Sequence, residues 1–330
     1  HTCTMTNVLG EFKTTASINS LGVRGKEFSL EKPKDGKRIL VIGDSMTFGW
    51  GVSDSQTYSF LLADALHKKG KQVEVINGGY IGGLSVDSYY VYLKKHGLAL
   101  KPDILILGFT VFNDITDVAG NIWKKIDKEG LPEQIESCCH IVDGHIFRNK
   151  IISFKYRYPT IRESHLFLLL IDTLQKKFNL FPDGALLAPR GETLLGCALN
   201  PDCIHLFYPE EEKAYKVLRE IKRLTEERHI QFLVVLFPVD LQMYPDASAK
   251  YERYGMKWYP KKGEEDFIQK RITGVLNQNG IPVLDLYPTF ASAKDKGYPF
   301  FPIDAHFNPI GTRMVADAIS QYMIEKKLVQ

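Results

Sequence analysis

Short, continuously apolar runs alternate along this chain with longer segments in which apolar residues recur every three to four positions. The first apolar run, Arg38–Ile42, leads through a glycine-containing turn into Tyr58–His67, where Leu and Ala have helical spacing. A continuous apolar run of this length is typical of a strand buried on both faces of a sheet. The pattern therefore predicts a buried strand that feeds a covering helix.

The same alternation continues to the C-terminus. Further strands are predicted at Gln72–Ile76, Ile104–Phe109, Gln231–Phe237 and Pro282–Leu286, and further helices at Asp87–Lys95, Glu210–Arg228, near Glu264–Asn277 and at Pro309–Met323. Asn308 is well placed as the N-cap of the last helix, with Pro309 in its first turn. Because helices between strands give a parallel sheet covered on both faces, we expect an α/β fold with five parallel strands in a doubly wound order.

One connection is far too long for a loop. About 95 residues separate Asp114 from the helix near Glu210, against the usual 2 to 6 residues of a strand-to-helix loop. We expect an insertion subdomain at about 115–209, which contains the apolar segment Ser164–Leu174. Since it leaves the sheet at the carboxyl end of a strand, where open α/β sheets bind ligands, it either covers the site or decorates the periphery. Residues 1–36 are expected to form an irregular N-terminal arm before the domain at 37–330.

Composition narrows the class of protein. Of the 330 residues, 44% are hydrophobic and 25% charged, which is typical of a globular protein with a sizeable core. The 42 Lys and Arg nearly balance the 39 Asp and Glu and are scattered, so we expect no nucleic-acid partner.

No apolar stretch approaches the roughly 20 residues of a transmembrane helix. The first residue, His1, fits a chain whose leader has been removed. Localisation is left open, with an extracytoplasmic location, periplasmic or secreted, favoured over a cytoplasmic one.

The cysteines do not indicate a metal site. The chain has five of them, without the paired spacing of zinc ligands: Cys3, Cys138, Cys139, Cys197 and Cys203. Cys197 and Cys203 bracket a short turn-like segment. A local disulfide is one interpretation of this spacing, and two reduced thiols are the commoner one.

Ser45 is the strongest candidate for chemistry. It lies in RILVIGDSMTFGWG (residues 38–51), where the first strand ends at Gly43 and the chain turns into the next element. At the carboxyl end of a strand its hydroxyl would face a cleft, and its backbone N–H could donate to a developing oxyanion. Gly-Asp-Ser alone is equally an ordinary turn or helix cap.

The longer string GDSMTFGWG after an apolar strand resembles the first signature block of the SGNH (GDSL-type) hydrolase family. The remaining blocks of that family follow here in the same order. Gly82, with Gly79 as the alternative, comes after the second strand, and Asn113-Asp114 ends the third, with Val111-Phe112 where the family commonly has Gly-x. FFPIDAHFNPIG (residues 300–311) supplies Asp304 and His306 before the last helix. The resemblance covers roughly residues 37–114 and 230–325.

Asp304 and His306 are two positions apart, whereas many members of the family have Asp-x-x-His. In an extended segment, residues i and i+2 project to the same side, so one imidazole nitrogen could be held by the carboxylate while the other faces Ser45. An Asp and a His before a helix are, taken alone, more often capping or solvent-exposed groups.

The resemblance implies a three-layer α/β/α sandwich of flavodoxin-like type and ester hydrolysis without metal or organic cofactor. Ser45 would be the nucleophile, His306 the general base and Asp304 the group that orients the imidazole, while Ser45 N–H, Gly82 N–H and the Asn113 amide would form the oxyanion hole. The substrate expected is a small-molecule or carbohydrate ester, with a short acyl group on a sugar or small alcohol.

Two alternatives stay open. The first is an O-acyltransferase that modifies a polysaccharide, because the Asp-x-His spacing also resembles that of some alginate-acetylation proteins, although their blocks are ordered differently. The second is a non-catalytic glycan-binding protein on the same fold. The aromatic residues between Tyr244 and Tyr259 either line the cleft or pack as a surface loop, the commoner outcome. The sequence leaves acyl length, the alcohol and the oligomeric state undetermined.

Overall fold

The computed structural model describes residues 1–7, 10–81, 84–136, 139–142, 145–148, 164–178, 192–252, 259–293 and 297–329. Its central sheet contains five parallel strands: β3 (Lys37–Gly43), β4 (Val73–Gly79), β5 (Ile104–Thr110), β10 (Gln231–Phe237) and β11 (Val283–Asp285). Their order across the sheet is β11-β10-β5-β3-β4. This is the doubly wound, flavodoxin-like order, as predicted.

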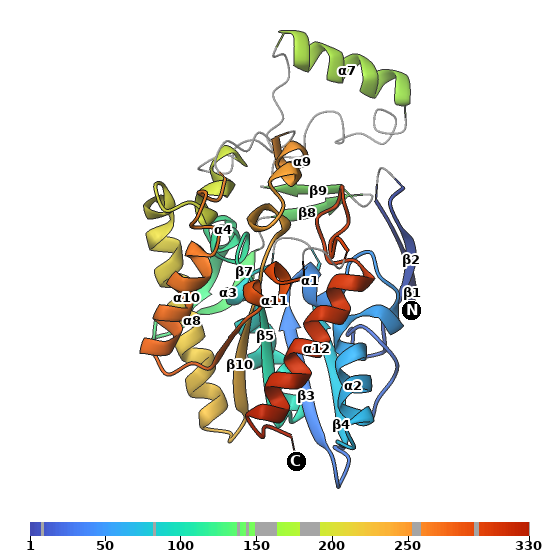
Figure 1. Ribbon diagram of the computed structural model, residues 1–330, viewed down its shortest axis with the longest axis vertical. Coiled ribbons are helices and arrows are strands. Elements are labelled where there is room, and N and C mark those ends of the chain that lie inside the picture. The colour runs from blue at the N-terminus through green and yellow to red at the C-terminus, as the bar shows by residue number, and fades with distance from the viewer. Residues whose placement is uncertain are drawn as a thin grey trace.

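Helices cover both faces of the sheet: α2 (Tyr58–Lys68), α3 (Val86–Lys95), α8 (Tyr208–Glu226), α10 (Phe267–Gln278) and α12 (Pro309–Glu325). Strand side chains alternate between the faces. Leu40 and Ile42 of β3 pack with α3, α8 and α10, whereas Ile39 and Val41 pack with α2 and α12. Figure 1 shows these helices around the sheet. All four side chains are fully buried, and each such side chain contributes about 1.5–3 kcal/mol to folding. The expected three layers are therefore present.

Shorter elements connect these layers: α1 (Ser45–Phe48), α9 (Ser248–Glu252), α11 (Tyr287–Ala291) and the 3₁₀ helices η1 (Asp54–Gln56), η2 (Gly97–Leu100), η6 (Asp240–Gln242) and η7 (Pro245–Ala247). Asn308 caps α12 as predicted, since its side chain accepts from the N–H groups of Ile310 and Gly311. Helix α8 begins two positions before the predicted start because Pro209 suits a first helical turn.

The expectation of an irregular N-terminal arm is wrong. Strands β1 (Thr2–Thr6) and β2 (Lys13–Ser17) form an antiparallel hairpin. The strand alternation places Met5 of β1 and Ala16 of β2 on the buried face, where they pack with Phe12 and with Phe48 at the end of α1. The arm is thus attached to the element that begins at Ser45.

The insertion starts with α4 (Asp114–Gly120) and the hairpin β6 (Ile122–Ile126)–β7 (Pro132–Glu136). This part packs on α3, because the Asn121 amide and the Trp123 indole N–H each donate to Asp87 at 2.8 Å. Further elements are β8 (Cys139–Val142), β9 (His145–Arg148), α7 (His165–Phe178), η4 (Glu192–Leu199) and η5 (Ile204–Phe207). Residues 149–163 and 179–191 are outside the described residues, so the hypothesis that the insertion covers the site stays a prediction.

Cys197 and Cys203 form a disulfide, so the expectation of reduced thiols is wrong here. The chain reverses between η4 and η5, because the N–H groups of Asn200 and Cys203 donate to the carbonyls of Cys197 and Asn200, and this reversal brings the two buried sulfurs together. Cys138 lies outside the described residues. Within the described part of the chain, no helix has both the length and the apolar character needed to cross a membrane.

Candidate active site

Ser45 is separated from β3 by Asp44 alone and begins α1 at the carboxyl end of the sheet. Its Oγ lies 2.7 Å from Nε2 of His306, although the two residues are 261 positions apart in the sequence. The other ring nitrogen of His306, Nδ1, is hydrogen-bonded to Oδ1 of Asp304. The structure therefore brings together the three side chains that the sequence singled out.

The expectation that Asp304 and His306 lie in an extended segment is wrong, because this segment forms a turn. Ala305 has a left-handed φ of 71°, and the loop is closed by hydrogen bonds from Phe301 N–H to the His306 carbonyl and from Ala305 N–H to the Phe301 carbonyl. A tight turn, rather than the alternation of a strand, directs both side chains to the same place. A left-handed non-glycine residue costs about 1–2 kcal/mol, so contacts elsewhere must hold this loop.

The two ionisable groups shift each other's pKa. Burial opposes ionisation of Asp304, but the hydrogen bond and the charge of His306 outweigh it and lower the pKa of Asp304. Burial likewise opposes protonation of His306, but the hydrogen bond and charge of Asp304, followed by the charge of Asp44, raise its pKa above the ordinary 6.5. With Nδ1–H donated to Asp304, Nε2 of the neutral ring accepts a proton from Ser45.

Trp50 is a member of the site that the sequence did not reveal. Its indole N–H donates to Oδ2 of Asp304 at 3.3 Å, so both carboxylate oxygens of Asp304 have partners. The His306 side chain is 25% exposed and that of Asp304 15% exposed. The imidazole can therefore meet a ligand from solvent while the carboxylate behind it is shielded.

Two glycines give α1 its place against the sheet. A Cβ on Gly79 would lie 2.2 Å from the backbone nitrogen of Phe48, and one on Gly43 would lie 2.2 Å from the Thr47 hydroxyl. No side chain fits at either position. The N–H of Gly79 donates to the Asn77 side chain at 2.9 Å, which directs it into the protein. Gly82, the preferred candidate for the oxyanion glycine, lies outside the described residues.

Asn113 contacts Asp44, the residue before the candidate nucleophile, so its amide is engaged. Its Nδ2 donates to a carboxylate oxygen of Asp44 at 3.3 Å and to one of Asp117 at 3.1 Å. Asp44 is buried, and burial raises its pKa. The Asn113 amide would thus have to release one of these carboxylates to donate to an oxyanion.

Asp114 fixes the loop that carries Asn113. Its carboxyl group accepts from the Thr110 N–H at 2.7 Å and from the Tyr89 hydroxyl at 2.8 Å. Burial, and then the charge of Asp44, raise the pKa of Asp114 well above its ordinary value. This carboxyl group is consequently part of the support for the site.

Arg24 is a second contributor that the sequence did not reveal. From the N-terminal arm its guanidinium donates to the carbonyls of Phe48, Gly49 and Val52 at 2.6–2.7 Å, and to Asp54 at 2.9 Å. The first two carbonyls are at the C-terminal end of α1, where helical carbonyls lack intrahelical partners. Arg24 thereby holds the short helix that begins with Ser45.

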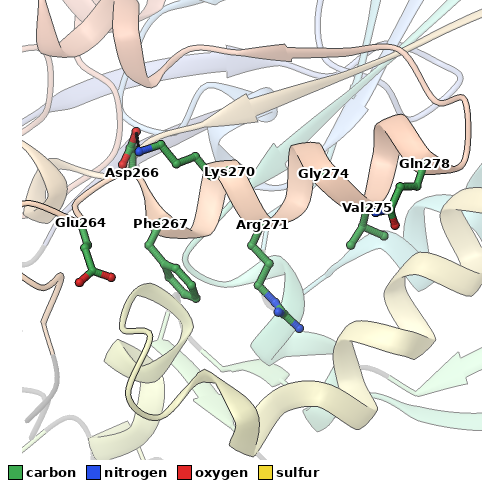
Figure 2. Close-up of a pocket in the computed structure, with 8 residues that line it drawn as sticks. All are labelled: Glu264, Asp266, Phe267, Lys270, Arg271, Gly274, Val275 and Gln278. Atoms are coloured by element: carbon green, nitrogen blue, oxygen red, sulfur yellow. Dashed lines mark ion pairs between the residues drawn. The ribbon is translucent and has the colours of Figure 1, made fainter.

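Two hollows lie outside this group of residues. One of about 390 Å³ next to the end of β4 is lined by Tyr80, Tyr92 and His96, among others. Another, of about 490 Å³, runs along α10, where Figure 2 shows Phe267 and Arg271 extending on the same side of the helix. Neither contains Ser45 or His306 in its lining.

The residues after β10 mostly pack. Tyr251 is buried and donates to Asp240 at 2.7 Å, and Tyr244 stacks edge-on against Tyr298. These two tyrosines fit the packing interpretation rather than a stacking surface for sugars. Tyr254 and Trp258 lie outside the described residues. Among the described residues, no group of three or more His, Cys, Asp or Glu side chains is arranged to hold a metal ion.

Comparison with known proteins adds a match to part of the chain. Residues 208–330 match the family model of the SGNH hydrolase-like domain of the acetyltransferase AlgX. The matched residues include Asp304 and His306, whereas Ser45 and Asn113 precede them. A thiopurine S-methyltransferase from Shewanella pealeana is 28% identical over 121 residues, which are 36% of this chain. The match covers 54% of that relative, so the chain spans about half the length of the curated protein it matches.

Similar solved structures include an acetyl xylan esterase, with 16% identity and a TM-score of 0.45 over 86% of this chain and 98% of that one. A lipase/acylhydrolase from Enterococcus faecalis has 13% identity and a TM-score of 0.46, over 89% of this chain and 97% of that one.

Proposed function

We propose that this chain is a serine esterase of the SGNH hydrolase type, which hydrolyses a short acyl ester of a carbohydrate or small alcohol. The observation that carries the proposal is the 2.7 Å contact between Ser45 Oγ and His306 Nε2, with Asp304 on the opposite nitrogen of the same ring. A serine hydroxyl is a weak nucleophile unless a base at this distance removes its proton.

The reaction proceeds in two halves. Ser45 Oγ attacks the ester carbonyl while His306 takes the hydroxyl proton, and Asp304 stabilises the imidazolium that forms. Collapse of the tetrahedral intermediate breaks the bond to the alcohol, which leaves with the proton from His306. Water, deprotonated by the same imidazole, then attacks the acyl-serine, releasing the acid and restoring Ser45.

The negatively charged oxygen of the tetrahedral intermediate needs hydrogen-bond donors to stabilise it. The Ser45 N–H is in the first turn of α1, where amides have no intrahelical acceptor. We assign the second donor to the Asn113 amide, which exchanges one carboxylate partner for the oxyanion, and the third to the Gly82 N–H. Each such donor typically contributes roughly 2.7–4 kcal/mol to transition-state stabilisation.

The test is hydrolysis of p-nitrophenyl acetate by the wild type and by Ser45→Ala, with Ser292→Ala as a matched control, because the Ser292 hydroxyl is bonded only locally to the Thr289 carbonyl. We expect Ser45→Ala to lose turnover and labelling by a fluorophosphonate, with an unchanged circular dichroism spectrum. Ser292→Ala should behave like the wild type. Wild-type protein that neither hydrolyses esters nor reacts with the probe would favour the non-catalytic, glycan-binding alternative.

A second candidate function keeps the same acyl-serine but passes the acyl group to a sugar hydroxyl. It is supported by the match of residues 208–330, which contain Asp304 and His306, to the domain of an acetyltransferase. The two functions differ in the acceptor alone. Acyl transfer to added polysaccharide that exceeds release of free acid, measured by mass spectrometry, would favour transfer, whereas release of acid at an unchanged rate would favour hydrolysis.

A further inference from the structure

The turn of the N-terminal hairpin reaches the loop that carries Asp304. Glu11, between β1 and β2, accepts hydrogen bonds from two consecutive backbone amides: Ile303 N–H to Oε1 at 2.7 Å and Asp304 N–H to Oε2 at 2.9 Å. Figure 1 shows the hairpin at the edge of the molecule beside the segment that leads into α12. Glu11 and Asp304 are 293 positions apart, so this contact joins the two ends of the chain at the candidate active site.

We propose that Glu11 is a positioning residue for the reaction, acting through Asp304 by fixing the backbone from which that carboxylate reaches His306. The inference rests on the proposed function. It assigns to the N-terminal arm a part in catalysis that none of the recognised signature blocks contains.

The carboxylate is itself held in place. Asn7 donates to Glu11 Oε2 at 2.9 Å and accepts from the Glu11 backbone N–H at 2.7 Å. Phe12, the next residue, packs against Phe301 with ring centroids 4.9 Å apart and edge-on against Trp50 at 5.8 Å. Glu11 therefore approaches the loop from a fixed position. The next residue, Phe12, packs both on Phe301 of that loop and on Trp50, whose indole donates to Asp304.

The loop needs such a support because its own conformation is costly. Ala305, directly after Asp304, is in the left-handed region with φ 71°. A paired acceptor on the two preceding amides fixes the peptide planes before this residue, and charge-assisted hydrogen bonds of this kind are about twice as strong as neutral ones. Without them, the Asp304 side chain would no longer be held in line with Nδ1 of His306.

The test is Glu11→Gln, which keeps the shape of the side chain but replaces one acceptor oxygen by an amide that cannot accept. Its matched control is Glu27→Gln on the same arm, since Glu27 accepts from the Ser20 backbone N–H at 2.7 Å and from its hydroxyl without contacting the site. Each purified full-length variant is assayed for kcat, KM, the pH dependence of kcat/KM and the midpoint of thermal unfolding.

We expect Glu11→Gln to lower kcat roughly ten- to a hundredfold, the usual scale for a misplaced catalytic group, with KM little changed. The acidic limb of its pH profile should move to lower pH, because a displaced Asp304 holds the proton on His306 less well. Glu27→Gln should match the wild type in both. A Glu11→Gln variant with the kcat and acidic limb of Glu27→Gln would overturn the proposal, whatever its thermal midpoint.

Asn7→Ala keeps the test decisive if Glu11→Gln does not fold. It leaves the Glu11 carboxylate in place but removes its anchor, and we expect a smaller shift of the acidic limb in the same direction; an unmoved limb would count against the proposal. Failure of the proposed function can be distinguished from failure of the role proposed for Glu11. In that case the wild type itself neither turns over esters nor reacts with the fluorophosphonate, whereas failure of this inference leaves an active wild type and an equally active Glu11→Gln.

Discussion

Arg24 donates a hydrogen bond of 2.7 Å to the carbonyl oxygen of Phe48, the last residue of the helix that Ser45 begins. The same guanidinium nitrogen reaches the Gly49 carbonyl at 2.6 Å. A helix of four residues has too few internal hydrogen bonds to hold its own shape, so its ends depend on outside partners. The position of Ser45 is therefore tied to a cation in the N-terminal arm.

Arg24→Met should destabilise the protein strongly. The substitution removes an almost wholly buried guanidinium that donates to the Asp54 carboxylate and to the carbonyls of Phe48, Gly49 and Val52. Each hydrogen bond of a charged group usually contributes about 1.5–3 kcal/mol to stability. Urea unfolding at neutral pH measures the change. Arg219→Met is the control, because Arg219 pairs with Glu212 in an exposed position where the loss is about 0–1 kcal/mol. Equal losses for the two variants would contradict the role given to Arg24.

The pH dependence of kcat/KM should report the Asp304–His306 pair. The base must be neutral to accept the Ser45 proton, and its pKa is raised above 6.5 despite burial, chiefly by the Asp304 hydrogen bond. The acidic limb of the wild-type profile is therefore expected to have its midpoint above pH 6.5. In Asp304→Asn the carboxylate is gone, so the midpoint should fall, together with a loss in rate of up to about 10⁴-fold.

A control variant tests whether the loss of any carboxylate lowers the midpoint of the acidic limb. Asp64→Asn removes an exposed partner of Lys68 on α2 and should leave the limb where the wild type has it. A wild-type midpoint below 6.5, or one that Asp304→Asn does not move, would separate Asp304 from the titration of His306.

Asn113→Ala should distinguish an oxyanion donor from a purely structural amide. If the amide turns from Asp44 to the substrate in the transition state, kcat falls by about 10²–10³-fold while KM stays nearly unchanged. Steady-state kinetics on p-nitrophenyl acetate measure the split. Asn121→Ala is a suitable control because its amide also donates to a buried carboxylate, that of Asp87 on α3.

A purely structural role of the Asn113 amide would give a different result in stability and in kcat. Were Asn113 only a partner for the carboxylates of Asp44 and Asp117, both asparagine variants would lower the free energy of unfolding by a similar amount and keep their kcat. That result would remove the Asn113 amide from the oxyanion hole.

The sheet was predictable because its strands are buried on both faces. Continuous apolar runs such as Ile104–Phe109 allow few alternatives, and Ser45 could be placed at a strand's carboxyl end from the run before it. Asn308 was predictable as a helix cap because a cap acts locally and has its own residue preference. Such features depend on neighbours in the sequence.

The supports of the site could not be predicted in this way. Arg24 and Glu11 act on backbone carbonyls and amides of distant segments, and backbone groups leave no trace in the sequence of the segment they belong to. Trp50 was visible inside the GDSMTFGWG string, but nothing there indicates that its indole meets Asp304. The left-handed Ala305 gives no sign either, because the residues that usually mark such a backbone are Gly, Asn and Asp.

Gly79→Ala should impair the site without touching a reacting atom. Its new Cβ would lie 2.2 Å from the Phe48 nitrogen and 2.6 Å from the Thr47 carbonyl carbon, so α1 must move and Ser45 with it. We expect a loss of stability of about 1–3 kcal/mol, the usual cost of overpacking, and a fall in kcat and in the rate of fluorophosphonate labelling. Gly274→Ala on α10 is the matched control, because a Cβ there has no heavy atom within 4 Å and should stabilise the helix by about 1 kcal/mol with unchanged kcat. If both variants gained stability and kept their kcat, the close contact between β4 and α1 would not be what sets the position of the nucleophile.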